Sequence, residues 1–519
     1  MVLLIPTLAA ILPFVLLLVL IVVKKWSSLK VMPLVWFVTA LISLLIWKLN
    51  IKLISASFIK GTFLTLEIML IIFGAVWLLT ILQEKKRMHY IQEFLSSISP
   101  DARIQAIIIA WLFGSLIEGV AGFGTPAAIV APLLVSLGFT PLLSVVLALI
   151  SNSTAVSFGA AGTPILLGLG SLNIEKDILQ EVTRNTALLH AIGSIIIPIA
   201  LVYLVISHSK TKIKKPLISI LPFAFLSWLS FIVPYFLVAW FIGPELPSIL
   251  GSITAIIITS TAAHFKFLTP KNTIEFAKHK RKTSPKQTLL SILPYILIIL
   301  LLLLSRLTAL KTTLTNITLS WTNILSTNIS YQFLPLYTPS FFFMLTALFS
   351  LVLFKTNKKE IKHTLKRTFS RVSKPTISLI FALALVQLFL ISSNSSLPSM
   401  PLLLAQLSTQ IFQQAYLFIT PYIGLLGSFI AGSNTLSNLL FGTFQLESAK
   451  SLGLPITIIL ALQVVGGAIG NMIAIHNVLA ANATVNLENA LGKVIRKTII
   501  VSLLYALIVG ITAFVIINI

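Results

Sequence analysis

Residues 114–126 read Gly-Ser-Leu-Ile-Glu-Gly-Val-Ala-Gly-Phe-Gly-Thr-Pro, and this stretch decides how the rest of the chain is interpreted. The surrounding residues are apolar, yet three glycines and a proline within eight residues cannot hold a regular helix. At membrane depth, broken backbone is tolerated only where it is buried in protein or lines a cavity. The stretch therefore predicts a helix break inside a bundle of membrane-spanning helices, with Glu118 close to the break.

The composition of the whole chain agrees with a membrane protein. Of its 519 residues, 57% are hydrophobic and only 10% are charged, whereas roughly a quarter of the residues in a soluble globular chain are charged. The chain contains no cysteine, which excludes disulfides, thiolate metal sites and cysteine nucleophiles. The sequence predicts a single all-α polytopic membrane domain over residues 1–519, with no soluble domain.

Apolar runs long enough for membrane spans recur along the chain, each near the roughly 20 residues that a helix needs to cross the hydrocarbon. Clear single spans are expected at about 3–23, 31–49, 62–82, 186–206, 216–241, 248–264, 288–306, 335–354, 375–391 and 498–517. Two further blocks, 104–170 and 411–482, are apolar but irregular, and each must cross the membrane once or three times. The expected total is 12 to 16 crossings.

The basic residues predict the orientation of the spans. Lys and Arg number 29 in one alternating set of inter-span segments, 24–30, 83–103, 207–215, 265–287, 355–374 and 486–497. They number 7 in the opposite set, 48–60, 170–185, 242–247, 305–332 and 392–410. Because cytoplasmic loops are rich in Lys and Arg, the first set is expected in the cytoplasm and the N-terminus outside.

The net charge of +24 could by itself indicate a nucleic-acid-binding protein. The positive charges, however, lie in short segments between apolar runs, where contact with anionic membrane lipid is the simpler interpretation. The first 23 residues carry no positive charge before the apolar run, and Lys24 and Lys25 follow it directly. This pattern favours a first span over a cleaved signal peptide.

The two irregular blocks contain an internal repeat. Gly114–Gly119 reappears 313 positions later as Gly427–Gly432, and Ser136–Gly138 reappears as Ser451–Gly453 at an offset of 315. Of the 24 glycines, 17 fall in residues 114–170 and 424–470. The charge count predicts that the two copies run through the membrane in opposite directions. Inverted repeats with broken or re-entrant helices are typical of secondary transporters, although a duplication retained for packing alone is the alternative.

Polar residues cluster beside the predicted breaks and suggest a binding site. The N–H groups and dipole of a half-helix N-terminus suit a carboxylate, and neutral side chains nearby can donate further hydrogen bonds. The candidate substrate-binding residues are Gly119, Gly122, Gly124, Thr125, Asn152, Ser153, Ser433, Asn434, Thr435, Asn438, Asn471 and Asn477. A structural role is the alternative for each serine and asparagine taken alone.

Few ionisable residues lie within the spans, and Glu118 is the only acid or base in 114–170. Removal from water favours the neutral form of a carboxyl group, as a proton carrier requires. The alternative is a permanently neutral acid bonded to open backbone. His476, which has polar neighbours, is the second candidate for proton coupling. His190 lies in a span without a matching polar cluster and is interpreted as structural. Glu67 is a possible second proton carrier, but it lies near a span end, where facing water is the alternative.

Other functional classes find little support. The sequence contains no HExxH, GxSxG or P-loop motif, so an enzyme or an ATP-driven pump is not expected. No metal site or cofactor is predicted, nor does the sequence indicate an oligomeric state. A passive anion channel remains possible, because neutral donors and helix ends also build pores.

Residues 118–126, followed by 136–139 and 158–165, resemble the L-lactate permease family of bacterial membranes. Gly243–Pro247 and Gly427–Phe441 fit the same family. The resemblance implies proton-coupled import of L-lactate, or of related small 2-hydroxy monocarboxylates such as D-lactate and glycolate, across the plasma (inner) membrane. The chain departs from the family at residues 470–477, where the familiar lysine and proline-glutamine pair are missing. This departure leaves the substrate and the coupling ion open.

Overall fold

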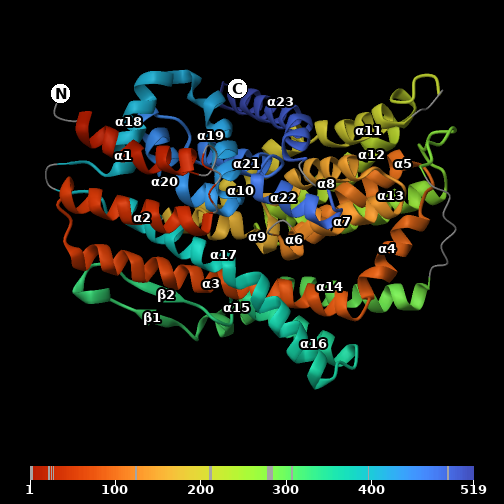
Figure 1. Cartoon of the computed structure of the whole chain (residues 1–519), viewed down its shortest axis with the longest axis horizontal. Coiled ribbons are helices and arrows are strands. Elements are labelled where there is room, and N and C mark those ends of the chain that lie inside the picture. Colours follow the sequence, from red (N-terminus) through yellow and green to blue (C-terminus); the bar gives the residue numbers. More distant parts are fainter. Residues whose placement is uncertain are drawn as a thin grey trace.

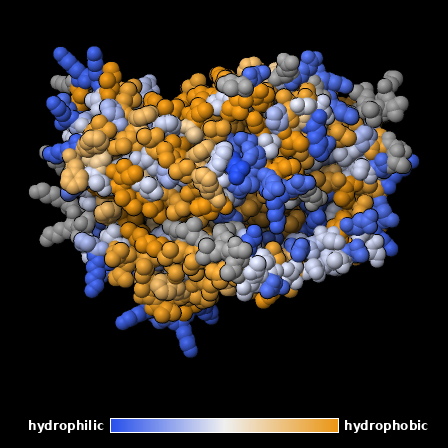
Figure 2. Space-filling view, turned by 180° about the vertical axis from the view of Figure 1, so that it is seen from behind, coloured by the Kyte–Doolittle hydropathy of each residue, from blue (hydrophilic) through white to orange (hydrophobic). Residues whose placement is uncertain are grey.

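The computed structural model describes residues 4–20, 24, 26, 28–122, 125–172, 174–209, 213–276, 284–305, 308–394, 397–487 and 490–518. It is an elongated bundle of helices, in which the first two helices of the chain lie near one end (Figure 1). Seen from behind, broad hydrophobic areas cover the surface between hydrophilic edges (Figure 2). This distribution suits a protein whose sides face lipid.

Helices form nearly all of the described chain. The N-terminal part contains α1 (Leu4–Leu18), α2 (Ser28–Leu45), α3 (Ile51–Glu84) and α4 (Arg87–Ser97). The first irregular block contains α5 (Ala102–Gln105), a π-helical stretch (Ala106–Phe113), α6 (Gly114–Ala121), α7 (Thr125–Ser136), α8 (Pro141–Val156) and α9 (Gly159–Leu166). The middle part contains α10 (Lys176–Gly193), α11 (Ile196–His208), α12 (Leu221–Phe241), α13 (Pro247–His264), α14 (Pro285–Leu304), α15 (Thr308–Thr315), α16 (Pro339–Leu353), α17 (Lys358–Leu390) and α18 (Met400–Phe412). The second irregular block contains α19 (Tyr416–Ala431), α20 (Asn434–Leu452), α21 (Ile456–Gly470) and α22 (Ile475–Thr484), and α23 (Leu491–Asn518) follows it.

The predicted all-helical, polytopic fold class is confirmed. Within the described residues, eight helices are long and apolar enough to cross a membrane, or up to ten if each of two bent helix pairs is one span. One of these pairs is α8 with α9, bent by 57°. Six further apolar helices are shorter. The expected 12 to 16 crossings therefore stay a prediction, because the total depends on how many of these shorter helices cross.

Several segments that were expected between spans contain helix, and two of them show the reason. Residues 51–60 belong to α3, so Lys52 and Lys60 extend a span rather than form an outer loop. Likewise, residues 358–374 are the first half of α17. Both expectations were wrong because charged residues were taken to end a span, whereas a helix can continue past the hydrocarbon into the polar interface.

The one departure from an all-helical fold in the described residues is a short hairpin. Strands β1 (Leu319–Trp321) and β2 (Tyr331–Phe333) pair antiparallel, with Leu319 opposite Phe333. The hairpin lies alongside α3 (Figure 1), and the Tyr331 hydroxyl donates a hydrogen bond to Glu67 Oε2 at 3.2 Å. Glu67 is thus hydrogen-bonded to this hairpin.

The two irregular blocks share one order of elements. In each, a helix ends at a glycine with positive φ, Gly122 (+58°) or Gly432 (+76°), and a second helix follows. A turn at another left-handed glycine, Gly138 or Gly453, then leads to a third helix. This third helix, α8 or α21, ends at a second break, after which α9 or α22 begins. The repeated motif in the sequence thus corresponds to a repeated helix–break–helix arrangement.

Close helix packing fixes α3 between α16 and α17. At Gly61, an added Cβ would lie 2.5 Å from the backbone nitrogen of Ala384 in α17. At Gly74, it would lie 2.8 Å from Phe343 Cβ in α16. Small residues permit such approach between membrane helices, where van der Waals contact rather than the hydrophobic effect holds helices together. These three helices form one side of the bundle.

A buried ion pair joins the start of the first block to two loops. Arg103 is fully buried and donates from Nη2 to Asp101 Oδ2 at 2.6 Å and from Nε to Asp101 Oδ1 at 3.0 Å. Its remaining N–H groups donate to Pro216 O, Ser219 Oγ and Asn272 O. All five guanidinium donors are therefore used, and α5 is held against the segments that follow α11 and α13.

Candidate functional site

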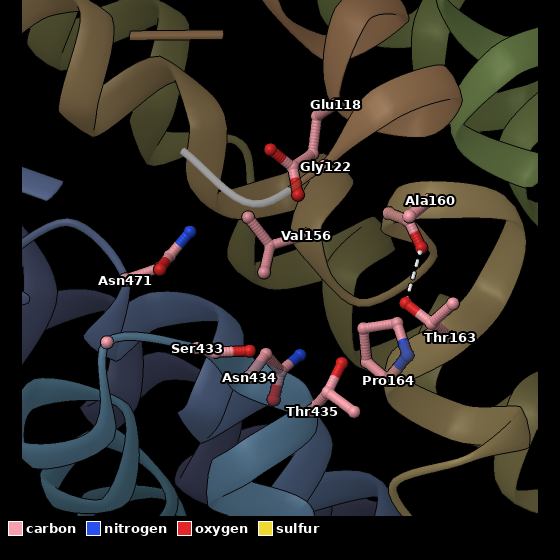
Figure 3. Close-up of a pocket in the computed structure, with 12 residues that line it drawn as sticks. Glu118, Gly122, Val156, Ala160, Thr163, Pro164, Ser433, Asn434, Thr435 and Asn471 are labelled. Atoms are coloured by element: carbon pink, nitrogen blue, oxygen red, sulfur yellow. Dashed lines mark hydrogen bonds between the residues drawn. The ribbon is translucent and has the colours of Figure 1, made fainter. Parts of the chain in front are cut away.

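A polar pocket lies between the two irregular blocks (Figure 3). The space between its lining residues, open solvent included, amounts to about 300 Å³. Its lining residues come from both blocks: Glu118, Gly122, Val156, Gly159, Ala160, Thr163, Pro164, Gly432, Ser433, Asn434, Thr435 and Asn471. Six of the residues proposed from the sequence thus meet at one place, namely Glu118, Gly122, Ser433, Asn434, Thr435 and Asn471.

Glu118 reaches the pocket because glycines make room for it. The helix α6 ends at Gly122, whose φ of +58° is a conformation that favours glycine. A Cβ at Gly159 would lie 2.5 Å from Glu118 Oε1, so a larger residue there would displace the carboxyl group. The Glu118 side chain is 3% exposed. Its carboxyl group therefore lies between the end of α6 and the start of α9.

Asn152 of α8 holds the carboxyl group of Glu118. Its Nδ2 donates to Glu118 Oε2 at 3.0 Å. An amide N–H can donate to a carboxylate or to the carbonyl oxygen of a neutral carboxylic acid, so this contact fits both protonation states. Asn152 is buried but is not among the pocket-lining residues. Its role in this geometry is to position Glu118.

The second helix break of the first block also lines the pocket, although its residues were not among the predicted site residues. Between α8 and the end of α9, Ala160 (φ +42°), Ala161 (+53°) and Gly162 (+79°) are left-handed. Left-handed alanine is unfavourable, and such strain persists where surrounding contacts enforce it. A Cβ at Gly162 would lie 2.6 Å from Pro244 O, which shows how closely the loop before α13 packs. The Gly-Thr-Pro sequence at 162–164 was the available signal.

The second block contributes the N-terminus of α20. Ser433 precedes this helix, and its side chain makes no capping hydrogen bond. Asn434 is 2% exposed, and neither Nδ2 nor Oδ1 has a hydrogen-bond partner. Buried polar atoms without partners are costly. The Asn434 amide and the unbonded N–H groups of the first helical turn are therefore available to a ligand in the pocket.

Gly467 of α21 makes this position of Asn434 possible. A Cβ at residue 467 would overlap Asn434 Oδ1. Asn471, one residue beyond the end of α21, is held by Asn477, whose Nδ2 donates to Asn471 O at 3.2 Å and also to Asn471 Oδ1. Asn477 therefore supports a pocket residue and does not itself line the pocket.

A hydrogen-bonded network lies behind the pocket and accounts for Asn438. Its Nδ2 donates to Pro164 O at 2.9 Å, and its Oδ1 accepts from Gln463 Nε2 at 3.4 Å. Gln463 also bonds Ser437 Oγ and Gln445. Asn438 thus joins α20 to α9 and is not a lining residue. No pattern in the sequence connected Gln445 and Gln463 with the site.

The other proposed residues lie elsewhere or outside the description. Gly119 packs on α13, where a Cβ would lie 2.8 Å from Ile249 Cγ1, and Ser153 donates to Ile150 O in its own helix. Gly124 lies outside the described residues, and Thr125 is placed only as the first residue of α7.

The two histidines differ in their surroundings. His190 is buried and bonded at both nitrogens, with Nε2 2.7 Å from Ser157 Oγ and Nδ1 2.6 Å from Tyr505 OH. These contacts fit its predicted structural role. His476 lies behind Gly432, where a Cβ would be 3.1 Å from its Nδ1, and this nitrogen has no partner. It does not line the pocket, so its role in proton coupling stays a prediction.

The pocket combines neutral donors, one acid and no basic side chain among its described lining residues. Groups of His, Asp and Glu that could hold a metal ion are absent from the described part of the chain. A polytopic helical fold with a polar pocket between repeated broken helices defines a membrane transport protein of the secondary-transporter class.

The chain belongs to the L-lactate permease family, whose model matches residues 6–519. A Haemophilus influenzae protein named provisionally as an L-lactate permease is 32% identical over 526 residues, which cover 96% of each chain. The L-lactate permease of Bacillus subtilis is 29% identical and covers 86% of this chain and 84% of its own. The glycolate permease of Escherichia coli is 27% identical over 85% and 83% of the two chains.

A solved structure, the YdaH transporter of Alcanivorax borkumensis, is 13% identical with a TM-score of 0.44, and covers 86% of this chain and 84% of that one. The family and the relatives are permeases, so the chain is a transporter and not an enzyme. The resemblance inferred from the motifs is confirmed.

Proposed function

We propose that this transporter imports L-lactate, or a related small 2-hydroxy monocarboxylate such as D-lactate or glycolate, together with a proton. The observation that carries the proposal is the unpartnered Asn434 amide at the N-terminus of α20, opposite Glu118 in the same pocket. The names of the relatives support lactate and glycolate as substrates.

The α20 N-terminus supplies the carboxylate site in this proposal. Its first-turn N–H groups and the positive end of its dipole attract an anion. The hydroxyls of Ser433 and Thr435 lie beside them in the pocket lining. The Asn434 amide, which can both donate and accept, then has a partner in the 2-hydroxyl group of the substrate.

Coupling to protons follows from the charges. A carboxylate in the pocket lies close to Glu118, and no basic side chain among the described lining residues offsets two negative charges. Like charges in a buried site disfavour each other, so the anion binds best when Glu118 is protonated. By linkage, substrate binding promotes proton binding to the same degree.

The repeated architecture supports alternating access. The pocket is shared by two helix–break–helix blocks that have the same order of elements, and we propose that they run through the membrane in opposite directions. Rocking of one block against the other would then open the pocket to either side in turn. The proposed location is the plasma membrane of a bacterium, with the N-terminus outside, as the Lys and Arg distribution favours.

The test is uptake of radiolabelled L-lactate into proteoliposomes. An imposed pH gradient, alkaline inside, should produce accumulation above the external concentration, and the accumulation should disappear without the gradient. Counterflow should also occur, because a carrier exchanges labelled for unlabelled substrate whereas a channel does not. Accumulation that is independent of the pH gradient would refute proton coupling, and absence of counterflow would identify a channel.

A further inference from the structure

The first half of α17 presents a basic row beside an apolar row. Lys358, Lys362 and Lys366 recur every fourth residue and so lie along one side of the helix, and all three are exposed. Ile361, Leu365 and Phe369 form the neighbouring row. Together with Phe73 of α3, these six residues line one groove.

The opposite face of this half-helix contacts α3 and the residue that follows it. Glu360 Oε2 lies 2.6 Å from Lys85 Nζ, and Arg367 pairs with Glu84. Thr364 accepts a hydrogen bond from Trp77 Nε1 at 3.2 Å. In contrast, no ion pair to Lys358, Lys362 or Lys366 occurs within the part of the chain that the structure describes. The lysine row is therefore positive charge that the fold itself does not neutralise.

Helix length places this groove at a membrane surface. The 33 residues of α17 extend about 50 Å at 1.5 Å per residue, whereas the hydrocarbon is about 30 Å thick. Its basic half must then extend into or beyond the headgroup layer. The helix also bends by 41° between Ser373 and Thr376, so the lysine row runs obliquely to the apolar half.

The apolar row agrees with this placement. Phe369 is 68% exposed and lies nearest to the apolar half of α17. The adjoining helix α16 also exposes apolar residues, Val352 at 79% and Leu348 at 49%, and the lobe at the lower left of Figure 2, where α16 lies, is hydrophobic with a hydrophilic tip. Exposed apolar surface of this kind marks contact with lipid or protein, and the adjacent unpaired lysines favour an anionic lipid.

We propose that the groove binds an anionic phospholipid, with its phosphate on the lysine row and an acyl chain along Ile361, Leu365 and Phe369. Anionic lipids are attracted to basic segments next to membrane spans. A zwitterionic lipid would leave the lysine charges unmatched, while a soluble phosphate would leave the apolar row uncovered. Because Phe73 belongs to α3, the bound lipid bridges α3 and α17 and holds the basic half of α17 in place.

The test measures lipid binding to the purified full-length protein by native mass spectrometry. Phosphatidylglycerol should bind in preference to phosphatidylcholine of the same acyl chains. The triple variant K358Q/K362Q/K366Q should bind phosphatidylglycerol roughly tenfold more weakly or worse, since each lysine near a membrane surface adds to the attraction. The matched control is K214Q/K215Q/K266Q, which removes three exposed lysines from other loops and should leave the binding unchanged.

Two further measurements keep the proposal falsifiable. The single variants K362Q and Phe369→Ala alter exposed side chains and should each weaken binding, even if the triple variant does not fold. Glycerol 3-phosphate, the soluble headgroup, should not compete. Equal binding of the two lipids, equal loss in the control triple variant, or competition by glycerol 3-phosphate would overturn the proposal.

Discussion

Glu118 is positioned by an amide on one side and by glycines on the other. With Asn152 Nδ2 at 3.0 Å, replacement by glutamine retains an acceptor for this donor but removes the ionisable group. Glu118→Gln is therefore expected to abolish uphill accumulation driven by the pH gradient and to retain counterflow of labelled substrate. Accumulation and counterflow in proteoliposomes check both halves of this prediction. If the glutamine variant still concentrates substrate, a residue other than Glu118 couples the proton, and His476 is the next candidate.

Gly159 tests whether the position of the Glu118 carboxyl group matters. A methyl group there would lie 2.5 Å from Glu118 Oε1, so Gly159→Ala must displace the carboxyl group. Initial uptake should fall at least about tenfold, since small misplacements of a reacting group are costly. Gly170→Ala is the matched control, because nothing lies within 4 Å of an added Cβ there. Equal uptake by both variants would show that the pocket tolerates a displaced Glu118.

For individual residues, the sequence predicted which side chains lie near the pocket better than it predicted the contacts that they make. Glycine breaks beside polar residues pointed to Glu118, Asn434 and Asn471, and all three line one pocket. Local patterns could not decide that Gly122 rather than Gly119 ends α6, or that Asn438 is already bonded to Gln463 while Asn434 is not. Those differences depend on contacts between segments that are distant in the sequence.

At the scale of elements, the buried Asp101–Arg103 pair joins α5 to two loops. Breaking a buried pair leaves an uncompensated charge and typically costs about 3–5 kcal/mol. Arg103→Ala should therefore lower the apparent melting temperature of the detergent-solubilised protein. Lys450→Ala removes an exposed partner of Glu447 and should have little effect, because exposed pairs contribute about 0–1 kcal/mol. Similar melting temperatures for the two variants would contradict a clamping role for Arg103.

Element boundaries were predicted well where apolar runs ended in turns and poorly where helices continued into polar surroundings. The left-handed stretch at Ala160 and Ala161 could not be foreseen, since alanine normally favours helix. The next residue, Gly162, packs closely against Pro244 O, a contact that local sequence does not reveal.

For the whole molecule, the Lys and Arg distribution predicts cytoplasmic placement of residues 265–287 and 355–374. Because the chain contains no cysteine, single cysteines can report on this directly. Cysteines at Lys271 and Lys359 should react with a membrane-impermeant maleimide only after permeabilisation, whereas one at Asn316 should react in intact cells. Labelling of Lys271→Cys and Lys359→Cys from outside would reverse the proposed orientation.

The pocket draws its two sides from segments far apart in the chain, and this separation matters during synthesis. Asn434 follows Glu118 by 316 residues, which takes about 15–60 s at translation rates of about 5–20 residues per second. During that interval the nascent first block has a buried acid and open backbone without the surface that later encloses them. The pocket can therefore close around Glu118 only after the ribosome has made the second block.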